Sequence, residues 1–187
     1  LNNASALSEE VLKESISSNP IDQAAHINYA RFLVGKKRND ESLEVINKAL
    51  LYFKDNFDLL EFKLRLAKLS NDESSIPVIL NSMRIGSPEN GEVYILQGNY
   101  YLYNKDYKKA INQFEIAYSK MQDKYKPLSL IVSTYLANNE ADLAIARLTK
   151  QLGVIPNDPV AYQLLGTVFS AKRDFTTVIE YLTNAVK

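Results

Sequence analysis

Apolar and polar residues along this chain recur with a period of 34 residues. Rows that start at Gln23 align without an insertion as 23–56, 57–90, 91–124, 125–158 and 159–187. Within each row, positions 4, 8 and 11 fall on one stripe of a helix, and positions 20, 24 and 27 fall on one stripe of a second helix. The pattern therefore predicts a series of helix pairs, with the last pair incomplete.

The residues on these stripes alternate between large and small. The third row shows the pattern best, with Tyr94, Gly98, Tyr101, Ala110, Phe114 and Ala117 at the six positions. Small residues let two helices approach closely, and large residues fill the gaps between them. We expect a second helix to cross at Gly98, so that Gly98→Leu would overpack the crossing at a cost of about 1–3 kcal/mol.

Turn and capping residues mark where the helices begin and end. The "NKD" segment at 104–106 predicts the turn inside the third pair, and Asp158 followed by Pro159 predicts an N-cap and a first helical residue. Pro77 lies where the second helix of the second row should already be running, and proline is tolerated only in the first turn of a helix. We expect this helix to start late, around 74–75, and to be shorter than its counterparts.

The rows resemble the tetratricopeptide repeat, whose helix–turn–helix unit carries a large residue at position 4, small residues at 8, 20 and 27, aromatic residues at 11 and 24, and proline near 32. The resemblance extends over residues 23–187, and the second row departs most, with Leu64 and Ile76 in small-residue positions. It implies an all-α fold, a right-handed α-solenoid of stacked antiparallel helix pairs.

The resemblance also implies a division of the chain. Residues 1–22 would hold the second helix of a preceding, incomplete repeat, over 8–19, and would be followed by repeats at 23–56, 57–90 (divergent), 91–124, 125–158 and 159–187 (truncated), all in one solenoid domain. Val178, Leu182 and Ala185 would form a partly exposed apolar end. Since each repeat buries its apolar face only against its neighbours, we expect either a piece of a longer array or end-to-end self-association.

Composition narrows the classes of partner. Lys+Arg and Asp+Glu number 22 each, so no global field favours nucleic acid or an anionic membrane. There is no cysteine, and no apolar run is long enough to suggest direct membrane insertion by this segment. The sequence does not identify the cellular compartment. The excess of lysine over arginine favours a bacterial source, for which the cytoplasm and the periplasm or cell envelope are both candidates.

The sequence offers no catalytic, cofactor-binding or metal-binding residues. His26 is the only histidine and occupies packing position 4, so we expect a buried or boundary side chain rather than a base. The segment "GSPENGEV" at 86–93 has phosphate-loop spacing, but Glu92 stands where a lysine is needed, so it predicts a turn. We therefore expect a protein that is not an enzyme.

In proteins with this repeat, first helices line a concave groove through positions 2, 5, 9, 12 and 13. The resemblance makes the following candidates for a peptide-binding groove: Arg31, Glu61, Arg65, Lys68, Asn99, Tyr103, Ser129, Ser133, Gln163 and Thr167. Arg31 and Arg65 would orient an acidic group of an extended peptide, while Asn99, Ser133, Gln163 and Thr167 would hydrogen-bond its backbone. Alternatively, Glu61 and Arg65 simply neutralise one another as an i,i+4 pair.

Two functional hypotheses follow from the resemblance. The first is a non-catalytic scaffold that binds another protein or peptide in the groove. The second is a structural spacer or self-assembling section of a bacterial envelope or exopolysaccharide secretion-associated protein. The general texture of the rows is similar to that of long tetratricopeptide lipoproteins of exopolysaccharide export, whereas the residue pairs that clamp a chaperone's C-terminal carboxylate in other members are not reproduced.

Overall fold

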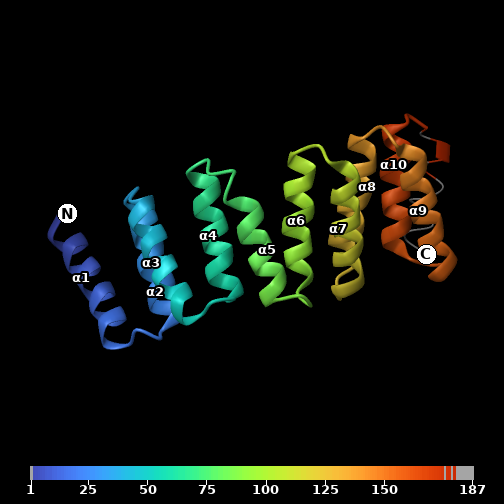
Figure 1. Cartoon of the computed structure of the whole chain (residues 1–187). Helices are drawn as coiled ribbons and strands as arrows, with labels where there is room; N and C mark the ends of the chain where they lie inside the picture. The colour runs from blue at the N-terminus through green and yellow to red at the C-terminus, as the bar shows by residue number, and fades with distance from the viewer. Residues whose placement is uncertain (1, 175, 178, 180–187) are drawn as a thin grey trace. The chain divides into compact units, whose positions relative to one another are not determined.

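A computed structural model describes residues 2–174, 176–177 and 179, with side chains from Ser8 onward. Over these residues the chain forms ten α-helices and no β-strand (Figure 1). The helices belong to two compact units, Leu1–Pro88 and Glu89–Lys187. The predicted all-helical class is confirmed.

Unit 1 contains helices α1 to α5. Their bounds are α1 (Asn2–Ser18), α2 (Gln23–Gly35), α3 (Asn39–Tyr52), α4 (Phe57–Leu69) and α5 (Ile76–Gly86). Each helix packs against the next one along the chain, and α2 also contacts α4. The core between α2, α3 and α4 consists of Ala30, Ile46, Ala49, Leu59, Phe62 and Leu66. Neighbouring pairs thus bury one another's apolar stripes, which none of them could do alone.

Unit 2 repeats this arrangement. Its helices are α6 (Gly91–Tyr103), α7 (Tyr107–Lys120), α8 (Tyr125–Ala137), α9 (Ala141–Val154) and α10 (Pro159–Ala171). Consecutive helices pack side by side, and α10 also contacts α8. A core of Leu128, Val132, Ala144, Leu148, Ala161, Leu164, Leu165 and Val168 joins α8, α9 and α10.

The turns inside the helix pairs show the same 34-residue period. Residues with positive φ other than glycine occur at Lys37, Asn71, Lys105, Asn139 and Arg173. In each case the next residue donates its N–H to a carbonyl five residues earlier, as Asp106 does to Tyr101 at 2.9 Å. This is the 6→1 bond of a Schellman motif, which closes the first helix. The turn predicted at 104–106 is confirmed, and Asp106 caps α7 by accepting from the Lys109 N–H.

Close helix packing at Gly98 is confirmed. A Cβ atom built on Gly98 would lie 2.3 Å from Cε1 of Phe114, which is fully buried in α7. The second-helix positions of this pair, Ala110, Phe114 and Ala117, are all fully buried, as are Ser42, Ile46 and Ala49 in the first pair. The glycine therefore makes room for the aromatic ring of its own helix pair.

The predicted helix boundaries hold except at the N-terminal helix. Helix α5 begins at Ile76 with Ser75 as its N-cap, has Pro77 in its first turn and is only 11 residues long. Asp158 caps α10, with Pro159 as its first residue. The prediction that the first helix begins at residue 8 is wrong, since α1 begins at Asn2.

The earlier start of α1 has a sequence explanation. Ala4, Ala6 and Leu7 have high helix propensity, so the helix continues on the N-terminal side of Ser8. The residues predicted to form an apolar end, Val178, Leu182 and Ala185, lie outside the described part of the chain. The assignment of the rows to repeats of one solenoid domain, with α1 left over from a preceding repeat, remains a proposal.

Candidate peptide-binding surface

In unit 1, the groove candidates lie on one face of α2 and α4. Arg31 is exposed on α2, Arg65 and Lys68 are exposed on α4, and Glu61 is half-buried. Residues 61, 65 and 68 follow the i, i+4, i+7 spacing of a single helix face. Arg31 and Arg65 occupy the same position in consecutive rows of two helices that contact one another.

The positive charges on this face are not neutralised by nearby acids. Among the described residues, no salt bridge or hydrogen bond involves the side chains of Arg31 or Lys68. Arg65 lies with its guanidinium carbon 5.7 Å from the ring centroid of Phe62, and no ion pair joins it to Glu61. The i,i+4 pairing considered from the sequence is therefore not formed. Among the groove candidates of unit 1, three are exposed cations and one, Glu61, is a half-buried carboxylate.

Hydrogen bonds at the other end of this face tie α2 to α4. Asn56 donates to Gln23 Oε1 at 2.9 Å, and the Gln23 Nε2 donates to Asp58 Oδ2 at 3.1 Å. Asn56 also caps α4 by accepting from the Leu59 N–H at 3.1 Å. Asp58 is in the first turn of α4 and Lys68 is in its last turn, so the face runs from acidic to basic along the helix.

Unit 2 presents a different chemistry at the equivalent positions. Asn99, Ser133 and Thr167 share position 9 of three consecutive rows and are exposed on α6, α8 and α10; Gln163 and Tyr103 are exposed as well, and Ser129 is half-buried. An ion pair from Lys126 to Glu92, with distances of 2.7 and 2.8 Å to the two carboxylate oxygens, joins α8 to α6 beside these residues. The face is polar without excess charge.

Hydrogen bonds within the helices limit what these side chains can offer a ligand. The hydroxyl of Ser133 donates to the Leu130 carbonyl at 3.0 Å, and that of Thr167 donates to the Gln163 carbonyl at 3.2 Å. Both hydroxyl oxygens keep lone pairs and can accept from a peptide N–H. The carboxamides of Asn99 and Gln163 make no hydrogen bond among the described residues, so they can both donate and accept.

The other sequence candidates have structural roles. His26 is only 3% exposed, and its Nε2 lies 2.9 Å from the Pro20 carbonyl oxygen, which confirms a packing side chain. The segment at 86–93 contains the start of α6, where Asn90 accepts from the Glu92 N–H. Within the described residues there is no group of three or more acidic, histidine or cysteine side chains suited to a metal ion. In the same residues, no helix has the length and apolar character to span a membrane.

Sequence reasoning missed a charge network that holds α1 against α2 and against Arg38, the N-cap residue of α3. Glu9 accepts from the Tyr29 hydroxyl at 3.0 Å, from Arg38 at 2.7 Å and from Lys13 at 2.9 Å. These bonds, above all the one from Arg38, lower the pKa of the Glu9 carboxyl to about 2. The partners are up to 29 residues apart, so no local spacing identifies them.

A second polar network links α7, α9 and the start of α10. Arg147 donates to Glu115 at 2.6 Å and packs its guanidinium on the Tyr118 ring. The Tyr118 hydroxyl donates to Gln151 at 2.8 Å, and Gln151 in turn donates to the N-cap carboxylate of Asp158 at 2.8 Å. These contacts join α7 to α9, and α9 to the N-cap of α10.

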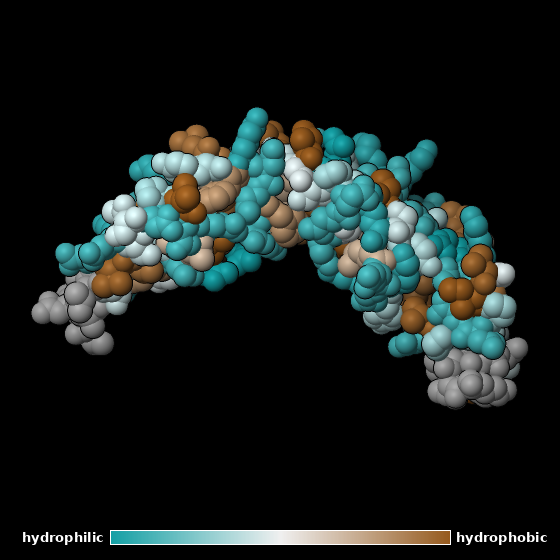
Figure 2. Space-filling model, turned by 90° about the horizontal axis from the view of Figure 1, so that it is seen from below, coloured by the Kyte–Doolittle hydropathy of each residue, from teal (hydrophilic) through white to brown (hydrophobic). Residues whose placement is uncertain are grey.

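Apolar side chains are exposed mainly as small islands in a polar surface (Figure 2). Among the side chains described in unit 1, the most exposed large apolar one is Leu51, at 83%, near the end of α3. In unit 2, Val154 at the end of α9 and Tyr103 at the end of α6 are 76% and 74% exposed. Of these three, only Tyr103 is among the predicted groove residues.

Comparison with known proteins identifies the fold. No family model matches the chain, and no curated protein matches it in sequence. Among solved structures, that of MamA has a TM-score of 0.61 at 16% identity and covers 87% of this chain and 89% of its own. The structure of YrrB, described as a tetratricopeptide-repeat protein with an unusual peptide-binding site, has a TM-score of 0.60 at 16% identity, over 95% and 92% of the two chains.

A tetratricopeptide-repeat protein from Parabacteroides merdae is similar to the same degree, with a TM-score of 0.60 at 16% identity, over 99% of this chain and 73% of its own. At this level of identity the likeness concerns the fold alone. The chain has the tetratricopeptide-repeat fold, as its residue pattern predicts.

Proposed function

We propose that this chain is a non-catalytic protein–protein interaction scaffold, which binds an extended peptide or protein segment on the exposed face of its first helices. The observation that carries the proposal is the set of cations in unit 1. Arg31, Arg65 and Lys68 are exposed on adjoining helices, and no acidic side chain among the described residues neutralises them. Adjoining cations without a salt-bridge partner create a positive potential at this surface, which favours an acidic partner.

The two arginines suit a carboxylate. A guanidinium forms two parallel hydrogen bonds with a carboxylate, and such charged bonds contribute about 1.5–3 kcal/mol each when they are well formed. Arg65 is already packed on Phe62, which limits the side-chain entropy that it would lose on binding. An aspartate, a glutamate or a C-terminal carboxylate of the partner would therefore lie between Arg31 and Arg65.

The polar face of unit 2 suits peptide backbone rather than charge. Asn99 and Gln163 can pair with a peptide group as donor and acceptor, and Ser133 and Thr167 can accept from its N–H. The exposed ring of Tyr103 offers apolar contact area for a side chain of the partner. The peptide-binding site named for YrrB supports this use of the fold.

The test is a quantitative pull-down with the whole chain as bait. Arg31→Glu/Arg65→Glu should lose most partner signal, and Asn99→Ala/Ser133→Ala should weaken it less. Lys48→Glu/Lys54→Glu is the matched control, because it makes the same change in net charge at two exposed positions of unit 1 away from this face. Equal recovery of all partners by every variant would refute the proposal. Concentration-dependent sedimentation of the free chain, unchanged in all variants, would instead favour a self-assembling spacer.

A further inference from the structure

Helix α4 carries a stripe of four charged residues whose signs are ordered along its length. The charged stripe consists of Asp58, Glu61, Arg65 and Lys68. At about 100° per residue, all four lie within about 80° of one another around the helix. Glu61 is half-buried and the other three are exposed. Both acids precede both bases, so the stripe has an acidic half and a basic half.

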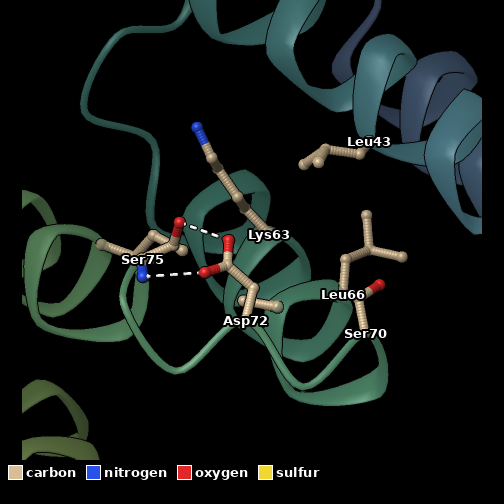
Figure 3. A pocket seen from close by; sticks show the side chains of 8 residues that line it. Leu43, Lys63, Leu66, Ser70, Asp72 and Ser75 are labelled. Carbon is tan, nitrogen blue, oxygen red and sulfur yellow. Dashed lines mark hydrogen bonds between the residues drawn. The ribbon is translucent and has the colours of Figure 1, made fainter.

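The remaining charged residue of α4 lies on the other side of the helix. Lys63 is two residues from both Glu61 and Arg65, which puts it about 180° from the middle of the stripe. It lines a pocket between α3, α4 and the turn before α5, together with Asp72 (Figure 3). Both charges of this pocket therefore lie away from the charged stripe.

The neighbouring helix α2 has the same polarity. Asp58 accepts a hydrogen bond from the first residue of α2, directly after the N-cap acid Asp22. The basic half of the stripe is next to Arg31, the only Asp, Glu, Lys or Arg residue within α2. In the turn before α4, Lys54 and Asp55 add one charge of each sign. The order from acid to base thus holds across both first helices of unit 1.

The helix dipole accounts for the outer two charges of the stripe only. It favours an acid in the first turn and a base in the last, where Asp58 and Lys68 lie. Glu61 and Arg65 occupy the middle of the helix, and their usual partners would be each other. Arg65 packs on Phe62 instead, and Glu61 makes no hydrogen bond or ion pair among the described residues. A carboxylate that is partly withdrawn from water in this way is stabilised by an incoming cation.

We propose that the segment bound on this face is amphoteric, with basic residues against the acidic half of the stripe and acidic residues against the basic half. The inference rests on the proposed function and adds a basic block to the acidic group that the arginines bind. A uniformly acidic segment would place a carboxylate next to Asp58 and Glu61, and a uniformly basic one would place a cation next to the arginines. Such like-charge contacts disfavour binding, so the order of signs selects both the partner and its register.

The length of the stripe suits an extended segment. The middles of its two halves are about seven residues apart in α4, or about 10 Å at 1.5 Å per residue. In an extended chain, alternate residues face the same side and each residue adds about 3.3 Å. Two basic residues followed by two acidic ones at alternate positions therefore have their charges centred about 13 Å apart. Flexible lysine and glutamate side chains can make up the difference.

The test is an amide NMR titration of the full chain, at low salt, with two peptides of one composition. Acetyl-Lys-Ser-Lys-Ser-Glu-Ser-Glu-amide has its charges in blocks, whereas acetyl-Lys-Ser-Glu-Ser-Lys-Ser-Glu-amide alternates them. Both peptides are neutral overall, so any non-specific attraction is the same. The blocked peptide should give saturable shifts in α2 and α4. It should bind about fivefold more tightly, because the alternating peptide meets like charges at two of the four positions.

Two variants with the same change in charge test the acidic half of the stripe. Glu61→Gln should weaken binding of the blocked peptide about threefold, while Glu44→Gln, at an exposed position of α3, should leave it unchanged. The proposal is overturned if the two peptides bind equally, if neither gives saturable shifts in α2 and α4, or if the two variants bind equally.

A third peptide separates this proposal from the proposed function. Acetyl-Glu-Ser-Glu-Ser-Glu-Ser-Glu-amide offers acids to the arginines but no base to Glu61, so it should bind more weakly than the blocked peptide. If it binds more tightly instead and loses its affinity in Arg31→Glu/Arg65→Glu, the acidic partner stands and the amphoteric one is refuted.

Discussion

The substitution Gly98→Ala tests the packing that we infer for the helix pairs. The added methyl group would lie 2.3 Å from Cε1, 2.6 Å from Cδ1 and 2.8 Å from Cζ of Phe114. These are three atoms of one ring rather than the tip of a flexible chain. Phe114 is fully buried, and so are Ala110 and Ala117 on the same stripe of α7, so the ring has no free space into which to move.

Two opposing effects set the size of the change. Alanine is favoured over glycine inside a helix by about 1 kcal/mol, because it loses less backbone entropy. Overpacking a tight core costs about 1–3 kcal/mol. Since the contact is with a fully buried ring, we expect the steric effect to win and Gly98→Ala to lower the free energy of unfolding by up to about 2 kcal/mol. Gly98→Leu would reach or exceed the upper end of the overpacking range.

The same substitution elsewhere provides the control. Gly153 also lies in a helix, and apart from its chain neighbours and the backbone of that helix, no atom of the described residues lies within 4 Å of a Cβ built on it. Only helix propensity acts there, so Gly153→Ala should stabilise by up to about 1 kcal/mol. Urea unfolding followed by circular dichroism would compare the midpoints at a common m-value. Midpoints that shift in the same direction in both variants would refute the packing argument, as would failure of Phe114→Leu to relieve Gly98→Ala in a double-mutant cycle.

Two further predictions concern a turn and a charge network. Lys105 has φ of 59° in the turn of the third pair, a backbone conformation that glycine adopts without strain. Lys105→Gly should therefore melt at or above the wild-type temperature, whereas Lys105→Val, which introduces a β-branched side chain, should lower the free energy of unfolding by about 1 kcal/mol or more. Equal melting temperatures of the two variants would contradict this. The pKa of Glu9 falls from 4.5 to about 2 on folding, so its contribution is complete above pH 4.5 and is lost as the pH falls toward 2. Hydrogen exchange should therefore show that the α1 amides are less protected at low pH than at neutral pH. In Glu9→Gln they should be less protected already at neutral pH. Equal protection of α1 in Glu9→Gln and wild type at neutral pH would refute this role.

Most of the fold could be predicted from the sequence because burial repeats with the helix pairs. Gly98 identified a close crossing, Pro77 predicted the late start of α5, and "NKD" at 104–106 predicted a turn. Gln151 shows what the pattern could not supply. It occupies a small-residue position and is 6% exposed, and it is accommodated only because Tyr118 and Asp158 satisfy its amide from other helices. The spacing of residues within one helix does not predict hydrogen-bond partners that come from other helices.

The candidate surface was less predictable than the fold. The period indicates which positions face outward, but it does not decide between competing side-chain contacts. Glu61 and Arg65 have the spacing of an ion pair, yet Arg65 packs on Phe62 instead. Ser133 looks free in the sequence, yet its hydroxyl proton is used by the Leu130 carbonyl. In both cases a neighbour within the same helix competes with the expected partner, and the outcome depends on side-chain rotamers.

The distribution of residues over the repeat separates folding from recognition. Position 8 must be buried in every pair, and there the chain has Ala30, Leu64, Gly98, Val132 and Gly166, all of them buried. Position 9, one residue later, is exposed in every pair and changes from Arg31 and Arg65 in unit 1 to Asn99, Ser133 and Thr167 in unit 2. Because exposed substitutions usually alter stability by less than about 0.5 kcal/mol, position 9 can vary without cost to the core. A substitution at position 9 that abolishes binding of a partner should therefore leave the midpoint of urea unfolding unchanged. A substitution at the buried position 8 should shift that midpoint.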